Sequence, residues 1–375
     1  MSSNKQVVIF GGGIAGVQLA KQLADEFKVT LVDPNDYFEV PMAVPRSLVR
    51  PEFAEQAIIP YAMALPNVTL VQGTLIEMGA NAGEVRTQDG RQITVSGDVQ
   101  VLCTGSIYAN ALLRSPGGNA EARKLIYRQY RQTVEAARDI LIVGGGPVGV
   151  EVAGELSESY PDKTLTLVEA GPRLLAGTSE LAARHAALVL ASRGVSILLG
   201  ERLQMSTKTH EDIFGGKGEA KTVSGRKLVY DLLVWCTGGR PNTSYMNPQL
   251  GEVLNARGQI RVGADLRVAG HAAMFALGDI TDLDENKMAW HIGGQVTCAA
   301  VNIRRVLQEH RRDPALARYK AQTGNPKMAV TLGSRQGVLH LPFFGVIRSP
   351  WFARKAKAEH MLVPKYRKLL KIREP

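Results

Sequence analysis

Two stretches of this 375-residue sequence show the same order of residue types. The first, VVIFGGGIAGVQLAKQL, covers residues 7–23, and the second, ILIVGGGPVGVEVAGEL, covers residues 140–156. Each begins with four apolar residues, which are typical of a buried strand, continues as Gly-x-Gly-x-x-Gly and ends in a helical pattern. A strand that passes through such glycines into a helix holds the pyrophosphate of a dinucleotide at the helix N-terminus. The sequence therefore predicts two dinucleotide-binding units.

The residues that follow the two stretches also match. The first motif has its glycines at Gly11, Gly13 and Gly16, and the second at Gly144, Gly146 and Gly149. In each case a second apolar segment follows and ends in an acid, because KVTLVD ends at Asp33 and TLTLVE ends at Glu169. A carboxylate at this place accepts hydrogen bonds from the ribose of a dinucleotide. One such motif alone could be a tight turn, but the ordered repeat favours two binding sites.

A further strand closes each unit. VQVLCTG ends in Thr104 and Gly105, and YDLLVWCTGG carries Thr237 and Gly238 where its apolar run stops. A glycine at a strand end lets the main chain approach a nucleotide without an intervening Cβ. We predict an α/β fold with two nested Rossmann-like dinucleotide-binding domains. They comprise residues 1–115 with 260–330, and residues 116–259, and a short basic amphipathic C-terminal segment follows at 331–375.

The composition is that of an ordinary globular protein, with 45% hydrophobic and 21% charged residues. No apolar run approaches the roughly 18–20 residues that a membrane-spanning helix needs. The N-terminal apolar stretch lacks the features of a signal peptide, and Ser2 stands where N-myristoylation requires glycine. We therefore expect a cytoplasmic protein without a signal peptide, a membrane span or a myristoyl group, with peripheral membrane attachment as the alternative.

Most of the net charge lies near the C-terminal end. The chain has a formal charge of +10, and residues 348–375 contain nine Lys or Arg against two Glu. Tyr366, Leu369 and Leu370 have the i, i+3, i+4 spacing of one helical face. Basic residues beside such a face suit an anionic membrane surface, and packing on the rest of the protein is the alternative. Because the remaining residues are nearly neutral, we expect no nucleic-acid partner.

The ordered set of motifs resembles the two-dinucleotide-binding-domain flavoproteins, the family of pyridine nucleotide–disulfide reductases and type II NADH dehydrogenases. The likeness covers about residues 6–282 and ends in MFALGDITD. Within this family, YFEVPMAVPRSLV and KMAWHIGGQVTCAAVNI are similar to the ferroptosis-suppressor branch, also called apoptosis-inducing-factor-like proteins. The resemblance implies a FAD-dependent NAD(P)H oxidoreductase that passes two electrons to a quinone-type acceptor, and a homodimer is one assembly left open.

The resemblance also implies site residues, with FAD in the first unit and NADH, or alternatively NADPH, in the second. For FAD these are Gly11, Gly12, Gly13, Ile14, Ala15, Gly16, Asp33, Arg46, Leu75, Thr104, Gly105, Asp279, Lys287 and Met288. For the nicotinamide dinucleotide they are Gly144, Gly146, Gly149, Glu169, Thr237 and Gly238. The catalytic positions that the resemblance implies fall on Glu151, Trp290 and Lys357. The plainer alternatives are an acid favoured by the helix dipole for Glu151 and core packing for Trp290.

Some features depart from the family pattern. The three cysteines, Cys103, Cys236 and Cys298, form neither a CxxxxC nor a CxxC pair, which excludes dithiol chemistry of that kind. Quinone-reducing NADH dehydrogenases often carry Ala-Gln-x-x-x-Gln, whereas here Trp290 and Gly294 replace the two glutamines. Two alternatives stay open: reduction of a small electron-carrier protein or soluble oxidant, and a non-enzymatic flavoprotein with a nucleic-acid-binding tail. No pair of histidines has metal-ligand spacing, so no metal site is predicted.

Overall fold

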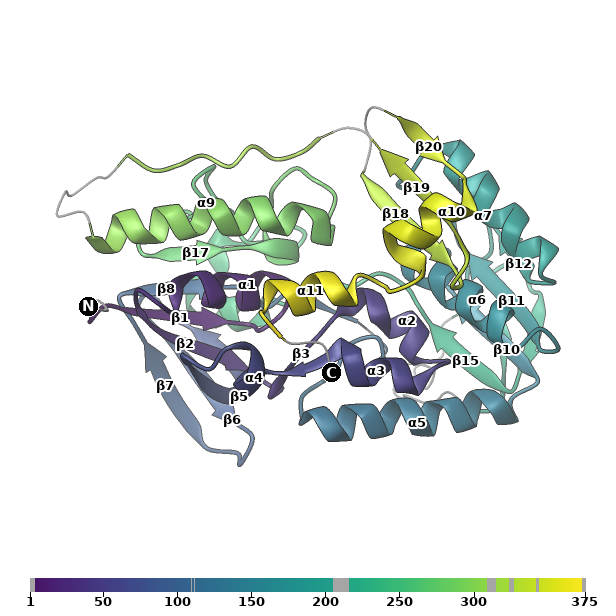
Figure 1. Ribbon diagram of the computed structural model, residues 1–375, viewed down its shortest axis with the longest axis horizontal. Helices are drawn as coiled ribbons and strands as arrows, with labels where there is room; N and C mark the ends of the chain where they lie inside the picture. Colours follow the sequence, from purple (N-terminus) through teal and green to yellow (C-terminus); the bar gives the residue numbers. More distant parts are fainter. Residues whose placement is uncertain are drawn as a thin grey trace.

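The computed structural model describes residues 4–108, 110, 112–204, 216–308, 315–323, 327–341 and 344–372. The chain forms two α/β units side by side, and a small third sheet packs on the second unit (Figure 1). The predicted α/β fold class is confirmed. Within the described residues, no helix combines the length and the apolar character needed to cross a bilayer.

The first unit is built on a seven-stranded sheet with the order β17-β8-β1-β2-β5-β6-β7. The strands are β1 (Gln6–Phe10), β2 (Lys28–Asp33), β5 (Val68–Met78), β6 (Ala82–Thr87), β7 (Gln92–Ser96), β8 (Val99–Leu102) and β17 (Met274–Ala276). Strands β17, β8, β1, β2 and β5 are parallel, and the β5–β6–β7 part is antiparallel. Because β17 comes from a segment far along the chain, its addition completes this sheet only after the chain has formed the second unit.

The second unit has a four-stranded parallel sheet with the order β12-β11-β10-β15. Its strands are β10 (Asp139–Val143), β11 (Thr164–Glu169), β12 (Ser196–Leu199) and β15 (Leu232–Trp235). The apolar residues of β10 are buried on both faces, as expected for a parallel strand covered by helices. The strand–glycine–helix stretches of the sequence thus become β1 with α1 (Ile14–Leu23) and β10 with α6 (Pro147–Ser159).

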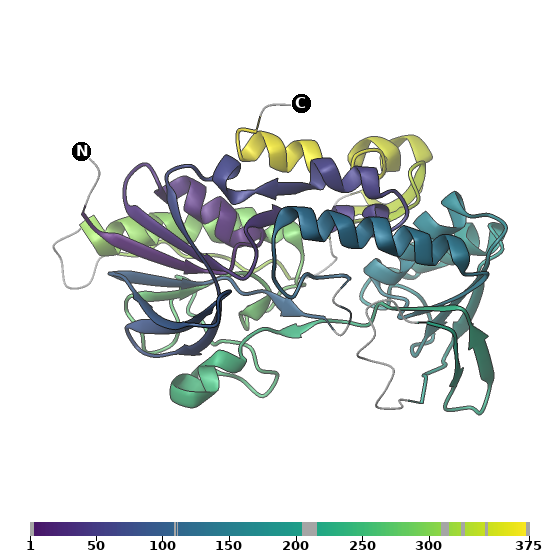
Figure 2. The ribbon, with the colours of Figure 1, turned by 90° about the horizontal axis from the view of Figure 1, so that it is seen from below.

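Between β8 and β17, the chain crosses from the first unit to the second and back again. β9 (Ser106–Ile107) leads out of the first unit and pairs antiparallel with β16 (Arg240–Pro241), which leads back. α5 (Ala120–Ala136) leads from the first sheet to the second and lies across the junction when the molecule is seen from below (Figure 2). The nesting supports the two-domain prediction, while the boundaries at residues 115, 259 and 330 stay a prediction.

The remaining elements frame these sheets. The longer helices are α7 (Glu180–Ser192), which covers the second sheet, and α9 (Ala289–Gln308), which packs beside α1. The short elements are β3 (Tyr37–Glu39), η1 (Pro41–Ala43), α2 (Val44–Ser47), η2 (Pro51–Phe53), α3 (Ala54–Ala57), β4 (Ile58–Pro60), α4 (Tyr61–Ala64), β13 (Gly218–Lys221), β14 (Lys227–Tyr230), η3 (Ser244–Met246), α8 (Asn247–Leu250), η4 (Gly251–Val253) and η5 (Gly278–Ile280).

The C-terminal segment touches both units. Its strands β18 (Met328–Leu332), β19 (Gln336–Leu341) and β20 (Gly345–Ile347) form an antiparallel sheet that packs on α6 and α7. After α10 (Pro350–Ala353) and the π-helical turn η6 (Arg354–Ala358), helix α11 (Val363–Leu369) returns to the first unit (Figure 1). The segment therefore connects the two units.

The predicted helical face at Tyr366, Leu369 and Leu370 packs on the protein itself. Tyr366 and Leu370 are buried in the core of the first unit, and Leu369 packs against it. The ring of Tyr366 lies 5.6 Å from the ring of Phe38, measured between centroids. Packing was one of the two alternatives for this face, and it leaves the apolar side of α11 unavailable to a membrane.

The docking of α11 can be tested by Tyr366→Ala. Because the ring is only 2% exposed, removing it should lower the free energy of unfolding by about 3 kcal/mol. Urea denaturation would measure the loss. Trp351→Ala is the matched control, since Trp351 is 63% exposed and should change the stability by less than about 0.5 kcal/mol. Equal, small effects of both changes would show that α11 does not stabilise the fold.

Candidate active site

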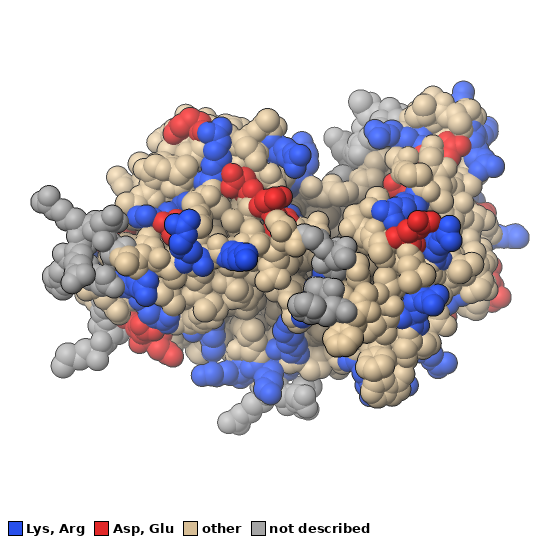
Figure 3. Space-filling model, turned by 90° about the horizontal axis from the view of Figure 1, so that it is seen from above, with Lys and Arg blue, Asp and Glu red and all other residues tan. Residues whose placement is uncertain are grey.

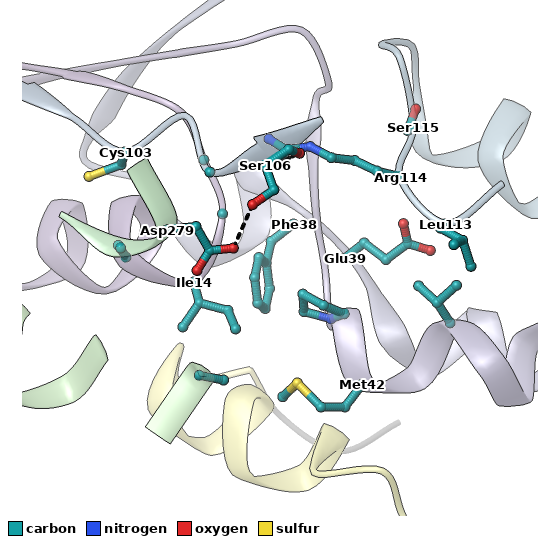
Figure 4. A pocket seen from close by; sticks show the side chains of 18 of the residues that line it. Ile14, Phe38, Glu39, Met42, Cys103, Ser106, Leu113, Arg114, Ser115 and Asp279 are labelled. Carbon is teal, nitrogen blue, oxygen red and sulfur yellow. Dashed lines mark hydrogen bonds between the residues drawn. The ribbon is translucent and has the colours of Figure 1, made fainter. Parts of the chain in front are cut away.

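A cavity of about 330 Å³ lies at the carboxyl ends of β1, β2 and β8, where the first unit meets the start of α6. The open carboxyl edge of a parallel sheet is the usual place for a dinucleotide in this kind of fold. Nine predicted residues line the cavity, namely Gly12, Gly13, Ile14, Ala15, Asp33, Gly105, Glu151, Asp279 and Lys287. Figure 4 shows Asp279 and Ser106 on one side of the cavity and Glu39 and Leu113 on the other.

The first glycine-rich loop is shaped by close main-chain contacts. Gly11 has φ +102°, and a Cβ on it would lie 2.4 Å from the carbonyl oxygen of Cys103. A Cβ on Gly16 would lie 1.9 Å from the carbonyl oxygen of Gly11. Gly13 differs, because the space around its missing Cβ is open and it starts α1 without a side-chain cap. The unpaired N–H groups of the first turn, beside the cavity, fit a pyrophosphate.

The second loop repeats this geometry. Gly144 has φ +107°, and its missing Cβ would lie 2.9 Å from the carbonyl oxygen of Cys236. The missing Cβ of Gly149 would lie 1.8 Å from the carbonyl oxygen of Gly144, while Gly146 faces open space and begins α6 without a side-chain cap. The start of α6 therefore has the same free donors as the start of α1.

The two acids at the strand ends hold these loops in place. One oxygen of Asp33 accepts a hydrogen bond of 2.6 Å from the Gly12 N–H, and one oxygen of Glu169 accepts one of 2.6 Å from the Gly145 N–H. Burial raises the pKa of Asp33, and the hydrogen bonds from the main chain of Gly12 and Asn35 oppose this rise. Since a carboxylate offers about four acceptor positions, both acids keep capacity for a ribose hydroxyl.

Asp279 reaches the cavity from η5. Its carboxylate accepts a hydrogen bond of 2.8 Å from the Ser106 hydroxyl on β9. The preceding Gly278 has φ +82°, a conformation that glycine adopts without strain. Lys287 follows on the same wall and donates to the carbonyl oxygen of Leu283 at 3.0 Å. The Gly-Asp motif of the sequence is thus a tight turn that presents a carboxylate to the cavity.

Other predicted residues lie outside the cavity lining. Leu75 packs in the core on the far face of the first sheet, and Met288 packs against the core of the second unit. Thr104 donates its hydroxyl to the carbonyl oxygen of Asn242 at 2.7 Å. Thr237 and Gly238 follow β15, next to the second loop. None of these five residues lines the cavity.

Trp290 lies at the start of α9 with 53% of its surface exposed. The ammonium group of Lys327 lies 3.3 Å from the centroid of its ring, and that of Lys365 lies 5.4 Å away. Core packing, the plainer alternative from the sequence, does not describe this residue. Its neighbours Ala289 and Ile292 line the cavity, so Trp290 is beside the cavity and not in it.

Glu151 and Lys357 form a buried ion pair, although they are far apart in the sequence. The ammonium nitrogen of Lys357 lies 2.5 Å from a carboxylate oxygen of Glu151 and also donates to the carbonyl oxygen of Ala329 at 3.1 Å. The same oxygen of Glu151 accepts the Thr331 N–H at 2.9 Å. Because Glu151 also lines the cavity, the C-terminal segment delivers Lys357 to its edge.

Arg46 is buried beside the cavity and does not line it. Its guanidinium donates to both oxygens of Glu155 on α6, with a shortest distance of 2.6 Å, and to the main-chain oxygen of Glu359 at 3.2 Å. Burial raises the pKa of Glu155, and the charge and hydrogen bonds of Arg46 oppose this rise. One side chain thus joins the first unit, the second unit and the C-terminal segment.

Sequence reasoning missed several polar residues of the cavity wall, among them Tyr61, Arg114 and Glu39. Tyr61 donates its hydroxyl to the carbonyl oxygen of Gly12 at 2.8 Å. Arg114 donates to the carbonyl oxygen of Thr104 at 2.7 Å, and Glu39 pairs with the buried Arg123 at 3.1 Å. Tyr61 and Arg114 belong to segments between the quoted motifs, and Glu39 lies in YFEVPMAVPRSLV, where no spacing marks it as a site residue.

Comparison with known proteins gives a consistent result. Residues 5–301 match the model of the family described as pyridine nucleotide-disulphide oxidoreductase. The chain is 30% identical to apoptosis-inducing factor homolog A of Dictyostelium discoideum, over 90% of this chain and 85% of that protein. It is 29% identical to ferroptosis suppressor protein 1 of Homo sapiens, over 91% of this chain and 90% of that protein.

Among solved structures, NDH2 from Plasmodium falciparum in complex with NADH superposes with a TM-score of 0.70 and 13% identity, covering 99% of both chains. At this identity the likeness concerns the fold alone. The fold agrees with the paired strand–glycine–helix units, and the family match spans most of the chain. This protein is a member of the pyridine nucleotide-disulphide oxidoreductase family.

Proposed function

We propose that this protein is a FAD-dependent NAD(P)H oxidoreductase that passes two electrons from NADH to a quinone-type acceptor at an anionic membrane surface. The observation that supports this proposal best is the equivalence of the glycine-rich loops at the starts of α1 and α6, together with the cavity at which their two units meet. Glu151 of the second unit lines this cavity beside the Gly12–Ala15 loop of the first. FAD would supply the hydride acceptor and pass two electrons on, and the protein would bind and orient the reactants.

For FAD, we propose that the first turn of α1 binds the pyrophosphate and that Asp33 and Asp279 accept hydroxyl hydrogen bonds. The open space at Gly13 and the uncapped N–H groups support this assignment. Arg46, which the family resemblance places beside the cofactor, would act indirectly by fixing α6 through Glu155. Leu75, Thr104 and Met288 would likewise shape the site through the sheet and core in which they pack.

For the nicotinamide dinucleotide, we propose the start of α6, with Gly144, Gly146 and Gly149 at the pyrophosphate. Glu169 would accept the ribose 2′-hydroxyl and repel a 2′-phosphate by its charge. The carboxylate is held by two main-chain N–H groups, those of Gly145 and Gly171, each at 2.6 Å. This arrangement favours NADH over NADPH.

Lys357 is our candidate for proton delivery to the acceptor. A quinone takes up two protons with two electrons, and the ammonium group of Lys357 pairs with Glu151, which lines the cavity. Glu151 and the carbonyl oxygen of Ala329 hold the nitrogen in place. Trp290 beside the cavity would provide a flat apolar edge for the acceptor ring.

The membrane contact, in this proposal, is an aromatic edge of the C-terminal segment. Trp351 and Phe352 are 63% and 53% exposed and touch edge to face, with centroids 5.0 Å apart. Arg348, Arg354 and Lys355 are exposed beside them in the sequence. Seen from above, the surface carries more Lys and Arg side chains than Asp and Glu side chains, and uncharged residues lie between them (Figure 3). Exposed aromatic and basic side chains together suit an anionic bilayer.

The electron-transfer proposal can be tested by anaerobic stopped-flow spectroscopy. The purified protein should be yellow, NADH should bleach the flavin, and a quinone should restore its absorbance. Asp279→Ala should lose most of its FAD, because hydroxyl groups of the cofactor lose a charged acceptor worth about 1.5–3 kcal/mol. Glu169→Ala is the control, and it should keep its FAD but accept NADPH more readily. Bleaching without reoxidation by any quinone would contradict the acceptor assignment and favour an electron-carrier protein.

A test of Lys357 must distinguish an effect on proton delivery from an effect on the stability of the fold. Lys357→Met leaves the buried carboxylate of Glu151 unpaired and should lower the free energy of unfolding by about 3–5 kcal/mol. The double variant Glu151→Gln, Lys357→Met removes both charges and should recover most of this loss. If Lys357 delivers a proton, reoxidation by quinone should stay slow in the stable double variant. Reoxidation at the normal rate in the double variant would limit Lys357 to a structural role.

The membrane edge can be tested by replacing both Trp351 and Phe352 with serine. Binding to vesicles of anionic phospholipid, measured by sedimentation, should fall about tenfold or more, since the apolar rings no longer enter the interface. The control replaces Val223 and Val229, which are 64% and 73% exposed on the β13–β14 hairpin. Salt should weaken binding of the unchanged protein. Equal binding by the serine variant and the control would contradict this docking surface.

A further inference from the structure

An extended segment outside both glycine motifs lies along α9. This segment, residues 315–323, is here called the strap, and Figure 1 shows it running over the helix. Asn302 of α9, which is fully buried, accepts the Ala317 N–H at 2.7 Å and donates to the Ala317 carbonyl oxygen at 3.0 Å. The Tyr319 N–H donates to the carbonyl oxygen of Ala264 at 2.7 Å. These bonds fix the position of the strap on the first unit.

The strap places the hydroxyl of Tyr319 on a buried carboxylate. The hydroxyl oxygen of Tyr319 lies 2.8 Å and 3.1 Å from the two carboxylate oxygens of Glu285. The side chain of Glu285 is only 1% exposed. The Gln322 N–H, also in the strap, donates to the same carboxylate at 2.9 Å. A buried charge needs such donors, because an unpaired one is costly. The strap therefore supplies two of the groups that make burial of Glu285 tolerable.

Glu285 in turn fixes the side chain of Gln295 on α9. The amide nitrogen of Gln295 donates to Glu285 at 2.7 Å, and its amide oxygen accepts the Gly278 N–H at 2.7 Å. These two partners set which end of the amide faces which way. Gly278 is the residue with φ +82° directly before Asp279. A continuous chain of hydrogen bonds thus runs from Tyr319 through Glu285 and Gln295 to the Gly278–Asp279 turn.

We propose that Tyr319, Glu285 and Gln295 are positioning residues for the flavin, which they influence by fixing the Gly278–Asp279 turn. The inference rests on the proposed function, because it assumes that the Asp279 carboxylate binds FAD. Without the Tyr319 hydroxyl, Glu285 has one donor fewer and holds Gln295 less firmly. The Gly278 N–H then loses a fixed partner, and the turn presents Asp279 in a wider range of positions.

The experiment follows FAD release from the holoprotein on dilution, by the rise of flavin fluorescence. Tyr319→Phe keeps the ring, which packs against Gly294, and removes only the hydroxyl. Its FAD release should be about tenfold faster, the equivalent of one hydrogen bond to a charged group. Glu285→Gln should also release FAD faster. Because it removes a negative charge near Lys287 of the cavity wall, it should also raise the flavin reduction potential, whereas Tyr319→Phe should leave that potential unchanged.

The control is Glu26→Gln, which removes the ion pair between Glu26 and Arg304 at 2.6 Å, on the part of α9 away from Gly278. It should change neither FAD release nor the potential. Equal acceleration in the control would reveal general loosening of α9 and overturn the proposal. Release at the unchanged rate in both Tyr319→Phe and Glu285→Gln would also overturn it. An unchanged protein that binds no FAD would instead overturn the proposed function.

Discussion

The architecture depends most on the burial of two carboxylates of α6. Glu151 and Glu155 lie one turn apart on this helix, and each pairs with a cation from outside the second unit. Removing charges from water is costly unless each is paired and hydrogen-bonded, so neither carboxylate tolerates the loss of its partner. Arg46 comes from the first unit and Lys357 from the C-terminal segment. The orientation of α6 is thereby tied to both, and so is the glycine loop at its start.

The sequence was sufficient to predict the parts of the fold that are determined locally. Short-range patterns were enough where apolar runs, glycine spacing and a terminal acid occupy neighbouring positions in the sequence. These patterns predicted strands β1, β2, β10 and β11, helices α1 and α6, and the acids Asp33 and Glu169. The resemblance, and not a local pattern, suggested Asp279, Lys287 and Glu151. Together, pattern and resemblance placed nine residues that line the cavity.

The parts that could not be derived from local patterns are those created by long-range packing. Nothing near Arg46 in the sequence indicates that it pairs with Glu155, and the apolar face of α11 looks the same whether a membrane or a core covers it. Only the fold decides between such alternatives, because the partner residues lie in distant segments. Glu151 and Lys357 are a second example, because they lie far apart in the sequence. The resemblance suggested each residue, but only the fold shows that they are in contact.

The position of the C-terminal segment has a consequence for synthesis in the cell. Because chains emerge from the ribosome N-terminus first, both glycine-rich loops have been synthesised long before residues 328–372 appear. Until then Glu151 has no ammonium partner, and the core of the first unit lacks Tyr366 and Leu370. A chain interrupted before this point would have both glycine-rich loops but an incomplete junction between the two units. The contacts that residues 328–372 make with both units therefore form only after both loops have been synthesised.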